Sequence, residues 1–242
     1  MTTIEDNLQQ VRGRIATACA RADRDVTAVT LLAVSKTFGP DAVSQAWLAG
    51  QRAFGENYVQ EGVEKILALQ DLLPGAGIEW HCIGPLQSNK TRQVATHFDW
   101  VQSVDRLKIA QRLSEQRPVD RAPLQVCLQV NVDGGANKSG VTPAELSGLA
   151  IAVAQLPRLR LRGLMCIPEP ADSFEAQRAV FLQARALFDE LNARGLGLDT
   201  LSMGMSDDLD AAIAAGSTMV RVGRAVFGSR AAPPERPDRS SI

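Results

Sequence analysis

The sequence predicts a single α/β domain, a TIM-type (β/α)8 barrel preceded by an extra N-terminal helix. Three observations predict it. Apolar, β-branched segments alternate with amphipathic helical segments eight times along the 242 residues. The connections between them are short, and no linker or internal repeat marks a second domain. Several strand segments are continuous apolar runs, which are typical of strands buried on both faces. A doubly wound open sheet is the alternative arrangement for the same alternation.

The individual elements follow from changes in the spacing of apolar residues. Ile4, Leu8, Val11 and Ile15 recur at helical spacing among polar residues, so we expect a helix before the first strand. The expected strands are residues 26–34, 52–55, 79–83, 100–104, 124–130, 159–164, 201–203 and 219–222. The expected helices between them are residues 39–50, 58–69, 89–97, 105–116, 142–155, 172–194 and 206–215. The barrel is expected to span residues 1–230, and residues 231–242, which lack an apolar period, to form a flexible polar tail.

Charge and cysteine content exclude several classes of function. The chain has 26 Lys and Arg against 27 Asp and Glu, so we expect no nucleic-acid-binding or membrane-binding surface. Its four cysteines form no C-x-x-C pair and it has only two histidines, so no metal site is expected. Dispersed thiols suit a reducing compartment, and residues 1–25 lack the apolar core of a signal peptide. We therefore expect a cytoplasmic protein.

Lys36 is the first candidate site residue. In a (β/α)8 barrel, chemistry is located where strands end, and Lys36 directly follows the first buried strand. The chain has only five lysines among its 26 basic residues, so a lysine at this position suggests a use for an amine. Unlike a guanidinium, an amine can lose its proton and attack a carbonyl carbon. A solvated lysine at a strand end is the alternative.

The loops after the last two strands form the second candidate cluster. Ser206 follows the seventh strand at an expected helix start, and Gly223 follows the eighth. These loops commonly bind phosphate in such barrels through backbone N–H groups, although Ser206 could also be a simple helix cap. Together with Lys36 they indicate a phosphorylated carbonyl ligand, either a sugar phosphate of a class I aldolase or pyridoxal phosphate (PLP). Arg221 ends the last strand, and an arginine facing the pyridine nitrogen favours PLP.

Longer motifs then carry a specific resemblance. The segments LLAVSKT, FGENYVQE, WHCIGPLQSNK, NKSGV, LRGLMCIP and LSMGMSDDLDAAIAAGSTMVRVG resemble the pyridoxal phosphate homeostasis protein family, related to the N-terminal domain of alanine racemase. The resemblance implies a monomeric barrel in which Lys36 holds PLP through a Schiff base. It implies a phosphate site at Ser206, Gly223 and Arg224, with Arg221 at the pyridine nitrogen, and a pocket lined by Asn57 and His81 beside Ser202 and Met203. Arg224 departs from the family, which usually has Ser or Thr after this glycine.

The resemblance implies a carrier and buffer of PLP rather than a dedicated enzyme. An arginine cannot give a proton to the ring nitrogen as a neutral acid does, so carbanion chemistry would be weak. Racemases of this type take a second base from an additional all-β domain, which a chain of this length has no room for. We expect PLP as the ligand, transient contact with apo PLP enzymes and weak binding of free amino acids. The alternatives are a weak, broad PLP-dependent racemase or lyase, a class I aldolase and a barrel without cofactor.

Overall fold

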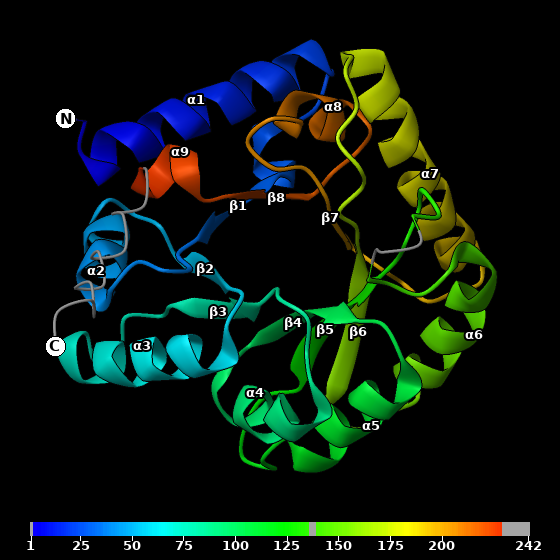
Figure 1. The fold of residues 1–242 in the computed structure, drawn as a ribbon, viewed down its shortest axis with the longest axis horizontal. Coiled ribbons are helices and arrows are strands. Elements are labelled where there is room, and N and C mark those ends of the chain that lie inside the picture. Colours follow the sequence, from blue (N-terminus) through cyan, green and yellow to red (C-terminus); the bar gives the residue numbers. More distant parts are fainter. Residues whose placement is uncertain (1, 136–138, 229–242) are drawn as a thin grey trace, which may run out of the picture.

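Eight parallel strands close into a barrel in chain order, as predicted (Figure 1). The computed structural model describes residues 2–135 and 139–228, so the predicted tail at 231–242 lies outside the described residues. The strands are β1 (Thr30–Val34), β2 (Ala53–Glu56), β3 (Glu79–Cys82), β4 (Trp100–Val104), β5 (Leu124–Gln129), β6 (Leu159–Met165), β7 (Thr200–Ser202) and β8 (Met219–Val222). Closure of β1 against both β2 and β8 excludes the open doubly wound sheet.

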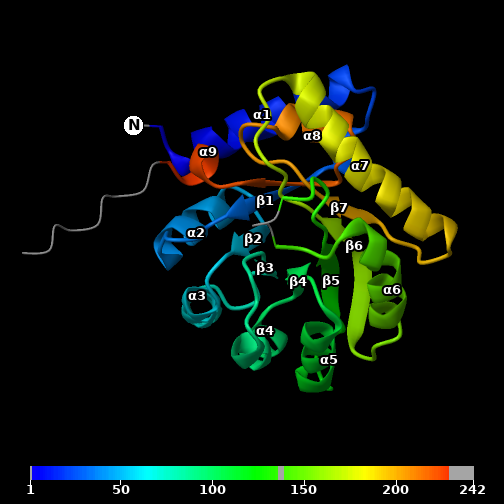
Figure 2. The same cartoon turned by 45° about the vertical axis from the view of Figure 1, so that its right-hand side comes forward.

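Helices form the outer ring of the barrel (Figures 1 and 2). They are α2 (Pro40–Leu48), α3 (Val59–Leu72), α4 (Thr91–His97), α5 (Leu107–Gln116), α6 (Pro143–Ala154), α7 (Phe174–Ala193), α8 (Leu209–Ala214) and α9 (Arg224–Phe227). The predicted extra helix is α1 (Ile4–Arg21), which packs beside α8 and α9. Within the described ranges, no helix is long and apolar enough to cross a membrane.

Alternation of side chains along the strands divides the apolar residues into an outer core and an interior. Leu31 and Ala33 of β1 belong to the outer core between strands and helices. Leu32 and Val34 belong to a separate interior cluster with Ala53, Ile83 and Met219. Because even-numbered residues of β1 face the interior, we infer that Lys36, two residues beyond Val34, lies on the interior side of the barrel mouth.

Several predicted boundaries differ from the structure by two residues or more, and local hydrogen bonds explain three of these differences. The first strand begins at Thr30, not residue 26, because Asp25 Oδ1 accepts from the Thr27 N–H at 2.8 Å and caps a 3-10 turn. Helix α7 begins after Ser173, whose hydroxyl accepts from the backbone N–H of the third residue beyond it. Helix α8 begins at Leu209, one turn later than predicted. The short helix α9 was not predicted.

Candidate functional site at the carboxyl ends of the strands

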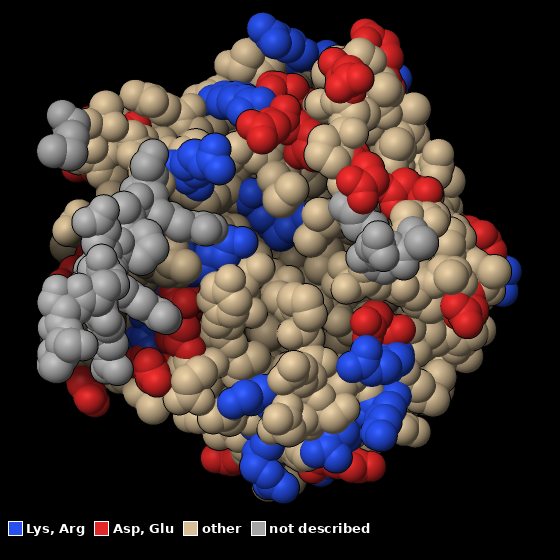
Figure 3. Space-filling view, viewed as in Figure 1, with Lys and Arg blue, Asp and Glu red and all other residues tan. Residues whose placement is uncertain are grey.

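Several of the predicted site residues lie at the same end of the barrel. Leu32 pairs with Arg221 between β1 and β8, and Val34 pairs with Gly55 between β1 and β2. The residues that follow these three strands therefore lie side by side at the same mouth. In space-filling view this face is hollowed at its centre, and Lys and Arg side chains (blue) gather at the hollow (Figure 3).

The turn that follows β1, residues 35–37, carries Lys36 and is held from the side of α3. Lys65 of α3 donates from Nζ to the Ser35 carbonyl oxygen at 2.8 Å. Glu61 Oε1 accepts from the Thr37 N–H at 2.5 Å. Thr37 has a φ of 70°, a left-handed conformation that is costly for a β-branched residue. These bonds hold the backbone on both sides of Lys36 and keep the strained turn in place.

A buried ion pair lies under this turn. Lys65 Nζ donates to Glu56 Oε1 at 2.6 Å and to Glu61 Oε1 at 3.0 Å, and the Ser35 hydroxyl also donates to Glu56 Oε1 at 2.6 Å. The Glu56 side chain is fully buried and Lys65 is 3% exposed. Burial raises the pKa of Glu56, and the adjacent Lys65 ammonium opposes that shift.

Sequence reasoning missed Lys65, although a signal was available. Lys65 is one of the five lysines, and it sits beside Ile66 in a helix whose buried face also includes Val63 and Leu69. A lysine within the apolar face of a helix needs a buried partner. The sequence alone did not show that this partner is Glu56 at the end of β2.

Arg221 is fixed inside the barrel by three hydrogen bonds. Its Nη1 donates to the carbonyl oxygen and to the hydroxyl of Ser202, both at 2.8 Å, and its Nη2 donates to the Cys166 carbonyl oxygen at 2.9 Å. The side chain is 4% exposed. Burial lowers the pKa of Arg221, but a guanidinium remains protonated in proteins. The structure therefore brings Ser202 beside Arg221 and places a fixed cation below the mouth.

His81 lies inside the barrel with both ring nitrogens engaged. Nε2 is 2.8 Å from Glu79 Oε1 and Nδ1 is 2.9 Å from Gln102 Nε2. The imidazole stacks on Trp100, with ring centroids 5.0 Å apart, and is fully buried. Burial lowers its pKa, which favours the neutral ring. His81 therefore has no ring nitrogen left for a ligand, and its effect on the site is exerted through Gln102.

The side chain of Met203 does not face the pocket. Met203 is fully buried in the outer core between strands and helices, whereas its predecessor Ser202 has its hydroxyl in the interior. The prediction that placed both residues at the pocket overlooked this alternation. The Met203 N–H donates to the Met219 carbonyl oxygen at 3.1 Å, and its carbonyl oxygen accepts from the Ser217 hydroxyl at 2.7 Å, so both backbone groups are engaged within the protein.

Ser206 lies in a turn rather than at a helix start. Asp208 is the residue before α8, and its Oδ1 accepts from the Met205 N–H at 2.5 Å, which closes the turn ahead of the helix. Burial raises the pKa of Asp208. Arg14 of α1 binds the Ser206 carbonyl oxygen from outside, so α1 supports this turn.

Gly223 precedes α9 at the neighbouring corner of the mouth. A Cβ on Gly223 would lie 3.2 Å from the Val34 carbonyl oxygen, so the residue allows β8 and β1 to approach closely. The backbone N–H groups at the start of a helix have no carbonyl acceptor within that helix, and this holds for the first residues of α9. Arg224, the first residue of α9, is exposed. Asn7 of α1 donates to the Val226 carbonyl oxygen at 3.0 Å, so α1 supports this turn as well.

Asn57 supplies an unsatisfied polar atom at the mouth. Its Oδ1 is buried without a hydrogen-bond partner in the described part of the chain. Its backbone lies against Gly84, where a Cβ would be 2.1 Å from the Asn57 carbonyl oxygen. A buried amide oxygen without a partner indicates a site for a ligand that donates a hydrogen bond. Together with Lys36, Arg221 and the Ser206 turn, these groups fit a phosphorylated aromatic aldehyde such as PLP.

Comparison with known proteins places this architecture in a family. The model of the alanine racemase N-terminal domain matches residues 6–231. A pyridoxal phosphate homeostasis protein of Pseudomonas aeruginosa is 59% identical over 230 residues, covering 95% of this chain and 97% of the relative. That of Escherichia coli K12 is 56% identical over 230 residues, covering 95% and 98%. The chain belongs to the pyridoxal phosphate homeostasis protein family.

Solved structures agree with this family membership. PipY of Synechococcus elongatus, solved without PLP, has a TM-score of 0.82 at 39% identity and covers 93% of this chain and 100% of its own. PipY with PLP bound has a TM-score of 0.79 at 38% identity, with the same coverage. Alanine racemase of Corynebacterium glutamicum has a TM-score of 0.67 at 20% identity and covers 90% of this chain and 62% of its own, so it shares the fold. A protein of this shape that is 38% identical to this chain thus holds PLP.

Proposed function

We propose that this chain binds PLP covalently through Lys36 and acts in intracellular PLP homeostasis as a carrier and buffer. The observation that carries the proposal is the meeting, at one barrel mouth, of the Lys36 turn, the fixed cation of Arg221 and the two turns at Ser206 and Gly223. Family membership and the PLP bound by PipY support it.

Each group has a separate task in this proposal. When bound, PLP supplies an aldehyde carbon that joins a primary amine reversibly as a Schiff base, with the loss of one water. Lys36 provides the amine, and the bonds to Ser35 and Thr37 orient its backbone. Ser206 and the N–H groups at Gly223 and Arg224 hold the phosphate. Arg221 faces the ring nitrogen, and Asn57 accepts a hydrogen bond from the ligand.

The state of Arg221 favours a carrier over a racemase. Its three hydrogen bonds hold a guanidinium that donates and does not release its proton. A guanidinium facing the ring nitrogen of PLP would leave that nitrogen unprotonated, so the ring would withdraw electrons poorly. We therefore expect little turnover of free amino acids, in addition to their weak binding. Reversible attachment at Lys36 still lets the amine of another protein take over the aldehyde, which is what a buffer requires.

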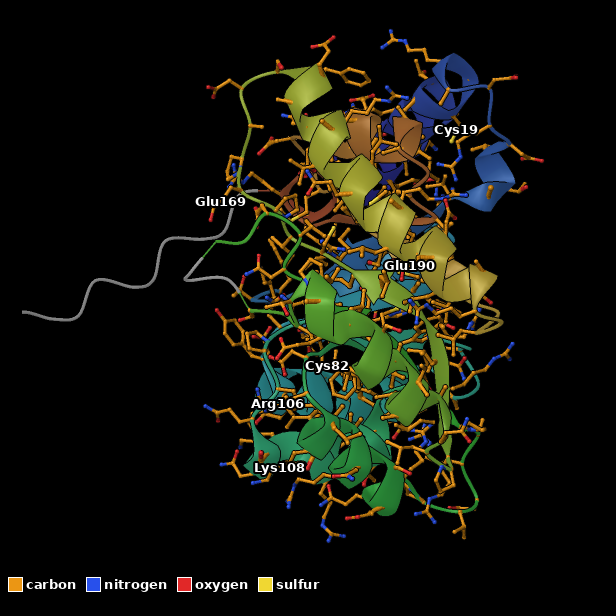
Figure 4. The ribbon with its side chains drawn as sticks, turned by 90° about the vertical axis from the view of Figure 1, so that its right-hand side faces the viewer. Cys19, Cys82, Arg106, Lys108, Glu169 and Glu190 are labelled. Carbon is orange, nitrogen blue, oxygen red and sulfur yellow. The ribbon has the colours of Figure 1, made fainter. Side chains whose placement is uncertain are left out.

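The visible spectrum of the purified protein tests the covalent site. Protein incubated with PLP is expected to become yellow, and Lys36→Ala is expected to lose that colour. The matched control is Lys108→Ala, which removes an exposed lysine of α5 and is expected to keep the yellow colour (Figure 4). Borohydride reduction followed by mass analysis is expected to place the adduct on the peptide containing Lys36. Colour retained in Lys36→Ala, or a sugar adduct in its place, would overturn the proposal.

Transfer kinetics test the carrier role. Loaded protein mixed with an apo PLP enzyme is expected to restore its activity faster than the same concentration of free PLP does. A rate no faster than with free PLP refutes delivery. Solvent deuterium exchange at the α-carbon of alanine or serine at the rate of a dedicated enzyme would favour the racemase or lyase instead.

A further inference from the structure

A continuous chain of hydrogen bonds crosses the barrel interior below Arg221. Arg221 Nη1 bonds the Ser202 hydroxyl at 2.8 Å, and the Ser202 hydroxyl bonds Gln102 Oε1 at 2.7 Å. Gln102 Nε2 bonds His81 Nδ1 at 2.9 Å, and His81 Nε2 bonds Glu79 Oε1 at 2.8 Å. Four strands, β8, β7, β4 and β3, thus contribute to one interior chain, which we call the Arg221–Glu79 chain.

The chemistry of the end groups fixes the direction of every hydrogen in this chain. An arginine only donates, so Ser202 Oγ accepts from Arg221 and gives its own hydrogen to Gln102 Oε1. The Gln102 amide then donates from Nε2 to His81 Nδ1, which must be unprotonated. The remaining hydrogen of a neutral His81 is on Nε2, where the Glu79 carboxylate accepts it. All four hydrogens point from the mouth toward Glu79.

The chain connects the two ends of the barrel through side chains that have no exposed surface. His81, Gln102 and Ser202 are fully buried, whereas the Glu79 side chain is 46% exposed. Glu79 is the first residue of β3 and so lies at the end opposite the mouth. A cation at one end and a carboxylate at the other favour the same direction of hydrogen bonding. The other charged groups that act on the two ends are Arg162 on Glu79, Asp99 on His81 and Asp208 on Arg221.

Protonation of His81 is incompatible with this arrangement. An imidazolium presents N–H groups at both nitrogens, so Gln102 would have to turn its oxygen toward His81. The Gln102 Nε2 group would then donate to the Ser202 hydroxyl oxygen, which already accepts from Arg221. The hydroxyl hydrogen of Ser202 would lose Gln102 Oε1 as its acceptor. Burial, which lowers the pKa of His81, acts in the same sense and keeps the ring neutral.

We propose that Glu79, at the far end of the barrel from Lys36, is a positioning residue for the cofactor. It fixes the tautomer of His81 and, through Gln102 and Ser202, the orientation of the Arg221 guanidinium. The effect on the cofactor rests on the proposed function, whereas the direction of the chain is a property of the protein without ligand. The two parts are therefore tested separately.

Nitrogen NMR of the ligand-free protein tests the chain itself. The sequence has two histidines, and His97→Gln assigns their signals. His81 is expected to keep its hydrogen on Nε2 and to remain neutral at pH values at which an exposed histidine is protonated. Glu79→Leu removes the acceptor and is expected to give a mixture of tautomers, whereas Glu79→Gln keeps an acceptor oxygen and is expected to preserve the tautomer. An unchanged tautomer in Glu79→Leu overturns the role of Glu79.

Cofactor binding tests the positioning effect. Glu79→Leu and Gln102→Leu are each expected to weaken PLP binding by about 2- to 30-fold, the range for residues that act at a distance through a network. Both are also expected to shift the pH at which the visible band of bound PLP titrates. The double variant is expected to lose no more affinity than Gln102→Leu, because the chain is already broken.

Two controls separate the possible failures. Glu115→Gln, an exposed carboxylate on α5, is expected to leave affinity, band and tautomer unchanged. Glu79→Leu could change the His81 tautomer and yet bind PLP with the same affinity, and titrate its visible band at the same pH, as Glu115→Gln. That result would overturn the positioning role. Failure of the unmodified protein to bind PLP overturns the proposed function, while the NMR result still decides the direction of the chain.

Discussion

Replacement of Lys65 by methionine isolates the energetic role of the buried ion pair. Methionine keeps most of the side-chain volume but removes the ammonium group and its three hydrogen bonds, at 2.8 Å to Ser35, 2.6 Å to Glu56 and 3.0 Å to Glu61. Glu56, which has no exposed surface, is then a buried carboxylate without its cation. Removing one partner of a buried pair destabilises a protein by about 3–5 kcal/mol, so we expect Lys65→Met to lie in this range.

The loss is expected to depend on pH. Burial already raises the pKa of Glu56, and without Lys65 nothing opposes that shift as strongly. When the pKa of a carboxyl is higher in the folded than in the unfolded protein, the protein is most stable at pH values below the unfolded-state pKa. That stability is lost as the pH rises through the folded-state pKa. Lys65→Met should therefore be less stable, relative to the unmodified protein, at pH 8.5 than at pH 5.5.

Urea unfolding at the two pH values, followed by circular dichroism, measures the effect. Lys108→Met on the exposed face of α5 is the matched control and is expected to change the free energy of unfolding by less than about 0.5 kcal/mol. Adding Glu56→Leu to Lys65→Met should recover much of the loss, because no buried charge then remains. A loss in Lys65→Met below about 1 kcal/mol, equal at both pH values, would refute this reasoning.

Three further outcomes are expected. Gly84→Ala should destabilise the protein by about 1–3 kcal/mol or more and weaken PLP binding, because the new Cβ would lie 2.1 Å from the Asn57 carbonyl oxygen. The control is Gly148→Ala on α6, where a Cβ meets open space, and it should stabilise the protein by about 0.5–1 kcal/mol. Thermal unfolding of the two variants compares these effects. Thr37→Asn should stabilise by about 0.5–1 kcal/mol in the same assay, because asparagine tolerates a positive φ, and equal or lower stability contradicts the strain argument. Ellman's reagent at pH 8 should leave the thiols of Cys82, Cys127 and Cys166 unmodified in the folded protein, because burial raises the pKa of each to about 12. Rapid modification of these thiols would contradict their burial.

The order of elements and the location of the mouth could be predicted from the sequence. Lys36 lies two residues after β1 and Asn57 directly follows β2, and in a closed parallel barrel all strand ends meet at one face. Arg221 lies within β8, and the alternation of this strand places it in the interior with Met219. These residues were predictable because strand periodicity and closure of the barrel determine their position.

The rest depended on contacts that periodicity does not encode. The partner of Lys65 is nine residues away on a different element, and its identity depends on how α3 packs against β2. His81 was predicted to line the pocket, but its two ring nitrogens bond Glu79 and Gln102. The sequence indicated this buried partner only through Gln102, a polar residue within an apolar strand. The helix start at Ser206 was wrong because Asp208 caps the preceding turn instead.

Helix α1 has a consequence for the order in which the protein assembles. It binds the turn at Ser206 through Arg14, across 192 residues, and α9 at Val226 through Asn7, across 219 residues. The segment synthesised first therefore waits for the segments synthesised last, and contacts between such distant positions form slowly. The two turns proposed to hold the phosphate are consequently among the last parts of the molecule to assemble.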